Sequence, residues 1–246
     1  MVDIGTIREA RERISPHLHV TPVLTCRTLD ESSAARLYFK CENFQKSGAF
    51  KARGATNAVF SLSDAEASRG VATHSSGNHA GALAMAARTR GIPAYIVMPR
   101  TAPGIKKEAV AGYGAEITFC EPTLEARETT LAGVVARTGA EFIHPYDDPR
   151  VISGQGTAAL ELVEQVEGLD LVITPVGGGG LLSGTAIAVS SASPGTLVFA
   201  GEPDGADDAC RSFRSGKLIP SVSPHTIADG LLTSLSERTF GIIRRY

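Results

Sequence analysis

The chain has 246 residues, of which 43% are hydrophobic and 20% charged, as in a globular protein with one large core or two modest ones. Its formal net charge of -2 gives no excess of cations for nucleic-acid phosphates or an anionic membrane surface, so neither partner is expected. Gly, Pro or Ser breaks every apolar stretch well before the ~20 residues of a membrane span, and the N-terminus lacks signal-peptide features, so we expect a cytoplasmic protein.

Apolar residues recur with helical and strand-like spacing along the first half of the chain. Ser63 is placed to begin one helix and Gly91 to end another. The predicted helices are 4–14, 54–60, 64–69, 80–90, 104–113 and 123–138. The predicted strands are 36–41, 71–74, 94–98 and 116–120.

The alternation of strands and helices continues in the second half. The predicted strands are 141–144, 169–176 and 196–200, and the predicted helices are 152–166 and 181–190. The run over 169–176 is apolar throughout, which is typical of a strand buried on both faces. Because parallel neighbours need crossover connections, the pattern predicts an α/β fold of parallel sheets flanked by helices. No linker is evident, so two domains would be interleaved in the sequence.

Four consecutive glycines, Gly177 to Gly180, stand between an apolar strand and a helix. Backbone N–H groups at such a helix start are unpaired, and the helix dipole favours an anion there. Glycine also lets the backbone approach the anion without a Cβ atom in the way. The run therefore predicts a phosphate cradle, with a flexible turn as the alternative. A dinucleotide site is disfavoured, since no G-x-G-x-x-G pattern fits.

Two further segments carry candidate chemistry. In Ser47-Gly-Ala-Phe-Lys-Ala-Arg-Gly-Ala55, Lys51 lies between Phe50 and a helix of small residues, where partial desolvation would lower its pKa and make the amine a nucleophile. A solvated surface lysine is the alternative. Ser75-Ser-Gly-Asn-His79 places hydroxyls and unpaired N–H groups between a strand and a helix, as a substrate carboxylate requires. An ordinary turn with an N-cap would look the same.

Together these three segments resemble the signatures of the fold-type II pyridoxal-phosphate enzymes, in the serine/threonine dehydratase and serine racemase branch. The phrases H-P-Y-D-D-P-R (144–150) and S-G-Q-G-T (153–157) resemble the same branch, and the resemblance covers nearly the whole chain. It implies a tryptophan synthase β-like fold of two interleaved domains. Residues 1–62 and 142–246 would form the large cofactor-binding domain, and 63–141 the small domain.

The resemblance also implies residue roles. Lys51 would hold pyridoxal 5′-phosphate as a Schiff base and act as the catalytic base, with Phe50 beside the cofactor ring and Asn78 bonded to its 3′-oxygen. The phosphate would be held by Gly177, Gly178, Gly179, Gly180 and Leu181. The substrate carboxylate would be held by Ser75, Ser76, Gly77, Asn78 and His79.

A metal site is implied by the segment Glu202-Pro-Asp-Gly-Ala-Asp-Asp208. Family members place a divalent cation at this point with two carboxylates and a main-chain carbonyl, here Glu202, Asp208 and the carbonyl of Ala206. Hard oxygen ligands suit Mg²⁺, Ca²⁺ or Mn²⁺. The ion would be structural, and a solvated acidic loop is the alternative.

The implied reaction is the removal of water and ammonia from L-serine or L-threonine to give a 2-oxo acid, so the expected partner is a small amino acid. Ser76 permits racemisation, because racemisation needs a second acid/base group on the opposite face of the intermediate; elimination is favoured. Family members continue beyond the point matching Tyr246, which leaves open a truncated, impaired cofactor-binding protein. Apolar surface uncovered in this way would favour a homo-oligomer, expected to be a dimer.

Overall fold

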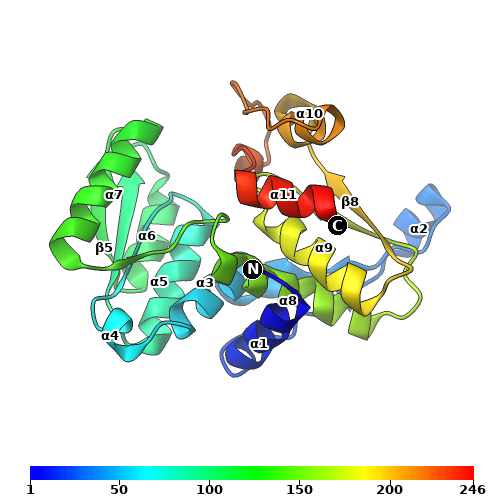
Figure 1. The fold of residues 1–246 in the computed structure, drawn as a ribbon, viewed down its shortest axis with the longest axis horizontal. Helices are drawn as coiled ribbons and strands as arrows, with labels where there is room; N and C mark the ends of the chain where they lie inside the picture. The colour runs from blue at the N-terminus through cyan, green and yellow to red at the C-terminus, as the bar shows by residue number, and fades with distance from the viewer.

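The computed structural model describes residues 1–246 and shows an α/β fold with two separate parallel sheets (Figure 1). The larger sheet has the order β5-β4-β3-β6, and every neighbouring pair is parallel. Its strands are β3 (Val71–His74), β4 (Ala94–Pro99), β5 (Glu116–Cys120) and β6 (Glu141–Phe142). The parallel α/β architecture predicted from the sequence is confirmed.

Both faces of this sheet are buried, because successive strand residues alternate between two layers of helices. Val71 and Ile96 belong to a core shared with the helices on one face, whereas Ala72 and Val97 pack with Leu131 of the helix on the other. The helices around this sheet are α3 (Lys51–Phe60), α4 (Asp64–Ala67), α5 (Asn78–Arg90), α6 (Gly104–Gly112) and α7 (Leu124–Thr138).

The smaller sheet pairs β7 (Leu171–Pro175) with β8 (Leu197–Gly201) in parallel. Its covered face packs on α9 (Gly180–Ala192), which is backed by α8 (Pro149–Gln165) and α1 (Ile4–Ile14). The predicted burial of this strand on both faces is wrong: Leu171 and Ile173 are 45% and 65% exposed, while Val172 is buried. No element of the chain covers their side of the sheet. The association of copies over such a surface stays a prediction.

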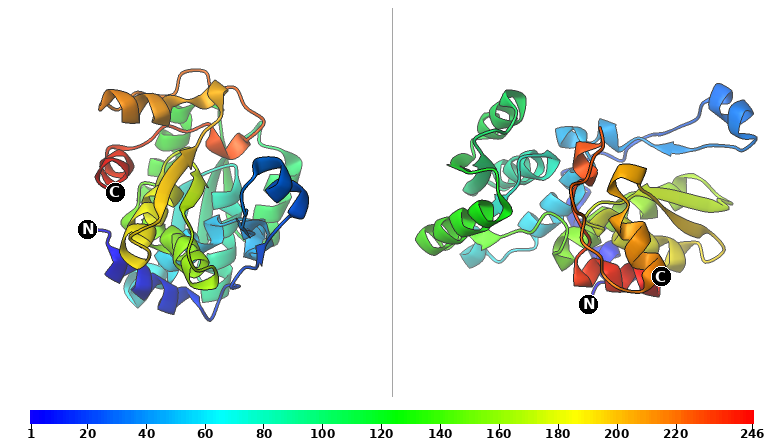
Figure 2. Two further views of the ribbon diagram at one scale, coloured as in Figure 1. Left: turned by 90° about the vertical axis from the view of Figure 1, so that its right-hand side faces the viewer. Right: turned by 90° about the horizontal axis from the view of Figure 1, so that it is seen from above.

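An arm projects from the body of the molecule (Figures 1 and 2). It consists of α2 (Arg27–Ser33), which buries no residue, carried by β1 (Val23–Leu24) and β2 (Phe39–Lys40). The strand predicted over 36–41 is therefore shorter, and it pairs antiparallel with β1. Two short 3₁₀ helices, η1 (Glu42–Phe44) and η2 (Lys46–Gly48), lead from the arm into α3.

The last quarter of the chain packs beside α9. Its elements are η3 (Asp204–Ala206), α10 (Asp208–Ser215), η4 (Asp229–Leu231) and α11 (Glu237–Arg245), and α11 lies against α9 (Figure 1). None of the helices combines the length and the apolar content that a membrane crossing requires. The proposed boundary between 141 and 142 falls within β6, so the domain limits stay predictions.

Candidate active site

The tetraglycine run forms the turn from β7 into α9. The first backbone hydrogen bond into this helix runs from the Ser183 amide to the Gly179 carbonyl at 2.8 Å, and the amides from Gly177 to Leu182 donate no hydrogen bond within the chain. Gly179 adopts φ +85°, a backbone conformation that favours glycine. Free amides at the positive end of a helix dipole make this turn an anion cradle.

The glycines also make room for neighbouring protein groups. A Cβ atom on Gly178 would lie 2.3 Å from the ring of Tyr146, and one on Gly179 would lie 2.6 Å from Leu235. The sequence predicts that missing Cβ atoms clear the approach of an anion. In the structure the Cβ directions of these two glycines point at protein side chains, and the free amides remain for the anion.

We therefore expect Gly178→Ala to destabilise the fold by about 1–3 kcal/mol, since the new methyl group would overlap the Tyr146 ring. Gly133→Ala in α7 is the control, because nothing lies within 4 Å of its Cβ position. This control should stabilise the protein by about 0.5–1 kcal/mol. Urea unfolding measures both variants, and a Gly178→Ala protein as stable as the wild type would contradict the overlap.

Lys51 is the first residue of α3, and its amine is placed by the loop after β6. Its Nζ donates to the Pro145 carbonyl at 2.8 Å, and no carboxylate forms an ion pair with it. The Phe50 ring centroid lies 5.2 Å from Nζ. Burial lowers the pKa of Lys51 to about 8. A large fraction of the amine is thus unprotonated near neutral pH, as a nucleophile or base requires.

The segment Ser75–His79 forms the turn from β3 into α5. The Gly77 amide donates to the Ser75 hydroxyl at 3.3 Å, whereas the amides of Ser76, Asn78 and His79 donate to no group of the chain. The side chains of Ser76 and Asn78 also form no hydrogen bond. This second helix start therefore offers free donors that fit a carboxylate.

The His79 side chain does not face that turn. It is 2% exposed, and its Nε2 lies 3.2 Å from the Ile143 carbonyl. Burial, reinforced by the charge of Lys51, lowers the pKa of His79 to about 3, so the ring is neutral. Of the contacts that the sequence predicts for His79, the structure leaves only the backbone amide free for a substrate.

One short segment between β6 and α8 touches all three motifs. The Ile143 carbonyl faces the His79 ring, the Pro145 carbonyl accepts from Lys51, and the Tyr146 ring lies against Gly178. The sequence marks this segment as the H-P-Y-D-D-P-R phrase but assigns it no role. A His-Pro-aromatic run directly after a strand was the available signal.

Two cavities border the site. The larger, about 420 Å³, contains Gly77 and Asn78; the smaller, about 200 Å³, contains Phe50 and Leu181. The predicted cofactor-binding residues thus divide between the two cavities. The larger cavity is also lined by Ser47, Gly48, Gly81, Lys106, Ala109 and Tyr113. None of these six was predicted from the sequence, and Lys106 forms an ion pair with Asp229 of η4.

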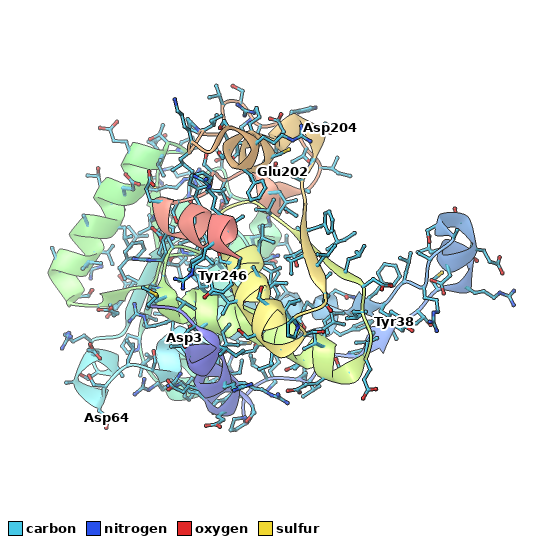
Figure 3. The ribbon with its side chains drawn as sticks, turned by 45° about the vertical axis from the view of Figure 1, so that its right-hand side comes forward. Asp3, Tyr38, Asp64, Glu202, Asp204 and Tyr246 are labelled. Atoms are coloured by element: carbon cyan, nitrogen blue, oxygen red, sulfur yellow. The ribbon has the colours of Figure 1, made fainter.

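The predicted metal residues gather where β8 leads into α10 (Figure 3). The Glu202 carboxylate accepts from the amides of Ala209 and Cys210 at 3.0 and 2.9 Å. Asp208 is 1% exposed, and its Oδ2 has no hydrogen-bond partner. Burial raises the pKa of both carboxyl groups. A divalent cation fits this pair, although no three metal-binding side chains converge, so the metal site stays a prediction.

If a cation is bound here, chelation by EDTA should lower the melting temperature of the protein more than it alters kcat. The reason is that Glu202 and Asp208 would brace the entry to α10, away from Lys51. Differential scanning fluorimetry with and without added Mg²⁺ measures the shift. Glu116→Gln, which removes an exposed carboxylate elsewhere, is the control. A melting temperature indifferent to both EDTA and Mg²⁺ would mean that the acidic loop is only solvated.

The residues present fit pyridoxal 5′-phosphate. An unpaired amine of lowered pKa suits its aldehyde, and the free amides of the tetraglycine turn suit its phosphate. The amides around Asn78 suit the carboxylate of an amino acid. Each cradle is the N-terminus of a helix that follows a parallel strand.

Comparison with known proteins agrees with this chemistry. The family model described as pyridoxal-phosphate dependent enzyme matches residues 14–246. A β-hydroxyaspartate dehydratase of Paracoccus denitrificans is 57% identical over 237 residues, which are 96% of this chain and 75% of that protein. The crystal structure of serine racemase from Dictyostelium discoideum superposes with a TM-score of 0.95 at 53% identity, over 99% of this chain and 78% of that one.

A third similar protein is the threonine deaminase from T.th., the abbreviation under which its source is given. Its crystal structure has a TM-score of 0.93 at 45% identity, and the match covers 98% of this chain and 79% of that one. The chain thus spans about three quarters of the length of these proteins. It belongs to the fold-type II pyridoxal-phosphate-dependent enzymes, in the group that contains serine racemases, hydroxyaspartate dehydratases and threonine deaminases.

Proposed function

We propose that this chain is a pyridoxal-phosphate-dependent ammonia-lyase that removes water and ammonia from a small L-3-hydroxy amino acid. The observation that carries the proposal is the segment between β6 and α8. It contacts the amine of Lys51 through Pro145 and the anion cradle through Tyr146. An amine nucleophile and a phosphate cradle are thereby fixed relative to each other by two adjacent residues of the chain.

The roles of the side chains follow from their surroundings. The bound cofactor would supply an electron sink for the negative charge left at the substrate Cα. Lys51, whose pKa is about 8, would first hold the cofactor and then accept the Cα proton at Nζ. The amides at the start of α5 would orient the substrate carboxylate, and those at the start of α9 would hold the phosphate.

Arg127 favours a dicarboxylic substrate, 3-hydroxyaspartate, over L-serine and L-threonine. Arg127 lies in the first turn of α7, forms no ion pair, and has a buried Nε without a hydrogen-bond partner. The pKa of His74, directly before Ser75, is lowered by burial and also by the charge of Arg127, while Glu128 acts in the opposite direction. A second carboxylate near Ser75 would satisfy this guanidinium. The Paracoccus relative named for β-hydroxyaspartate supports the same choice.

The test compares kcat/KM for L-threo-3-hydroxyaspartate, L-serine and L-threonine, with the 2-oxo acid product identified. We expect the dicarboxylate to be preferred, and Arg127→Met to reduce its preference over L-serine by on the order of 10- to 100-fold, the effect of losing a charge-assisted hydrogen bond. Arg137→Met is the control, because Arg137 sits on the same helix in an exposed pair with Glu116. An unchanged preference in Arg127→Met would exclude Arg127 from substrate recognition.

Serine racemisation is the second candidate, and Ser76 is the observation that favours it. Its hydroxyl forms no hydrogen bond within the chain and so is free to act as a second acid/base group. The racemase from Dictyostelium discoideum is a close structural match. One incubation with L-serine, assayed for both 2-oxo acid and D-serine, separates the candidates. Ser76→Ala should remove D-serine formation and spare elimination if racemisation occurs.

A further inference from the structure

His144 shapes the segment that places Lys51. Its ring Nδ1 accepts hydrogen bonds from two backbone amides, Tyr146 N at 3.3 Å and Asp147 N at 2.8 Å. A side-chain acceptor that bonds the amides two and three residues later closes a tight turn, as Asn and Asp side chains do in Asx turns. Pro145, inside the turn, has no N–H and a restricted φ. The turn is therefore set by one acceptor atom.

This turn aims two groups at the proposed site. The Pro145 carbonyl lies 2.8 Å from the Nζ of Lys51 and is the one protein group that accepts a hydrogen bond from this amine. The Tyr146 ring lies against the backbone of Gly178, and the Tyr146 backbone and Cβ lie against Gly180. If the turn opened, the amine would lose its acceptor and the tetraglycine turn would lose a packing neighbour.

The acceptor works only while Nδ1 carries no proton. Burial lowers the pKa of His144 to about 4, with His74 and Lys51 acting in the same direction and Asp147 and Asp148 opposing. The ring packs edge-on against Tyr146, with the centroids 4.6 Å apart. The neutral imidazole must then carry its proton on Nε2.

We propose that His144 is a positioning residue for Lys51: its unprotonated Nδ1 holds the Pro145–Asp147 turn, and the turn orients the Lys51 amine through the Pro145 carbonyl. The proposal rests on the role proposed above for Lys51. It adds a residue that reaches neither cofactor nor substrate directly but fixes the group that does.

The test uses a matched pair of variants, His144→Asn and His144→Leu. Both lose the ring and share one heavy-atom skeleton, but only Asn keeps an acceptor, because its Oδ1 takes the position of the histidine Nδ1. Leu leaves the two amides unpaired, so the turn should open. Capture of pyridoxal 5′-phosphate by the cofactor-free full chain should slow by on the order of tenfold in the Leu variant and stay near wild type in the Asn variant. In the loaded Leu enzyme kcat should fall much more than KM changes.

Two measurements separate this proposal from the role of Lys51 in turnover. The reactivity of Lys51 toward acetic anhydride, followed by peptide mass spectrometry across pH, should change in the Leu variant and be rescued in the Asn variant, with or without catalysis. Nitrogen-15 NMR of the wild-type histidines should show the Nε2-protonated form of His144 at neutral pH, and this holds even if the Leu variant fails to fold. A proton on Nδ1, or equal Lys51 reactivity in the Asn and Leu variants, would overturn the proposal.

Discussion

Lys51→Ala is expected to abolish turnover while leaving the fold intact. The substitution removes the amine that would anchor the cofactor covalently and accept the Cα proton, and losing a general base alone costs on the order of 10²- to 10⁴-fold in rate. The measurements are 2-oxo acid formation and visible absorbance of the purified protein before and after borohydride. Phe50→Leu, which alters the neighbour but keeps the amine, is the control. Appreciable turnover by Lys51→Ala would refute the assignment of the base.

The pH dependence of the same residue follows from its lowered pKa. Burial brings the pKa of Lys51 from 10.5 to about 8, so capture of the cofactor should accelerate as pH rises through about 8 and then level off. The unfolded chain binds this proton more tightly than the folded chain, so stability should rise with pH between about 8 and 10.5. Below that window the cost of burying the ammonium is fully present.

Lys51→Met should therefore be more stable than the wild type at neutral pH when both are free of cofactor. The advantage should shrink as pH rises toward 10.5, where the wild-type amine is neutral in the folded state. Urea unfolding at the two pH values measures the difference. A Met variant that is less stable at neutral pH would show that the amine gains more from the Pro145 carbonyl than it loses by burial.

Regular elements were predictable where local signals agree. The helix over 4–14 is found with the bounds predicted, because its apolar spacing coincides with a capping box at Asp3 and Thr6. The strand over 169–176 was predicted less well. A continuous apolar run carries no period-two signal, so the sequence cannot reveal that Ile173 faces outward; that depends on which elements pack on each face.

The candidate site divides along the same physical line. Lys51 and the tetraglycine turn were predictable because their chemistry depends on residue type and on position at the start of a helix. The bond between Lys51 and Pro145 joins residues 94 positions apart, and local pattern does not predict such contacts. The inward orientation of the His79 ring was missed for the same reason, since packing against Ile143 determines it.

A buried charge network two residues beyond Lys51 gives the largest expected effect on stability. Arg53 is 1% exposed and donates to both carboxylate oxygens of Glu42 at 2.7 and 2.8 Å and to both of Glu161 at 2.7 and 2.8 Å. Lys40 donates to Glu161 at 2.7 Å. The network thus ties α3 to η1, β2 and α8, so it braces the helix that carries Lys51.

Arg53→Met should destabilise the protein by about 3–5 kcal/mol, because it leaves two buried carboxylates with Lys40 as their one cation. Arg11→Met is the matched control. Its partner Glu164 is 47% exposed and Arg11 itself 41%, so losing that pair should cost less than about 1 kcal/mol. Urea unfolding at neutral pH measures both variants. Equal losses would show that burial adds nothing to the Arg53 pairs.

Acid should reveal the same network. Burial acts to raise the pKa of Glu161, but the hydrogen bonds and charges of Arg53 and Lys40 outweigh it and lower the pKa below 4.5. A carboxyl group with a lowered folded-state pKa contributes stability that is present above the unfolded value and is lost as pH falls through the folded one. Arg53→Met removes most of that contribution, so its stability should decline less as pH falls from about 6 to about 4 than that of the wild type, from a lower starting level. A wild-type decline no steeper than that of the variant would mean that Glu161 gains little from Arg53, and that the arginine acts mainly by filling the space between α3 and α8.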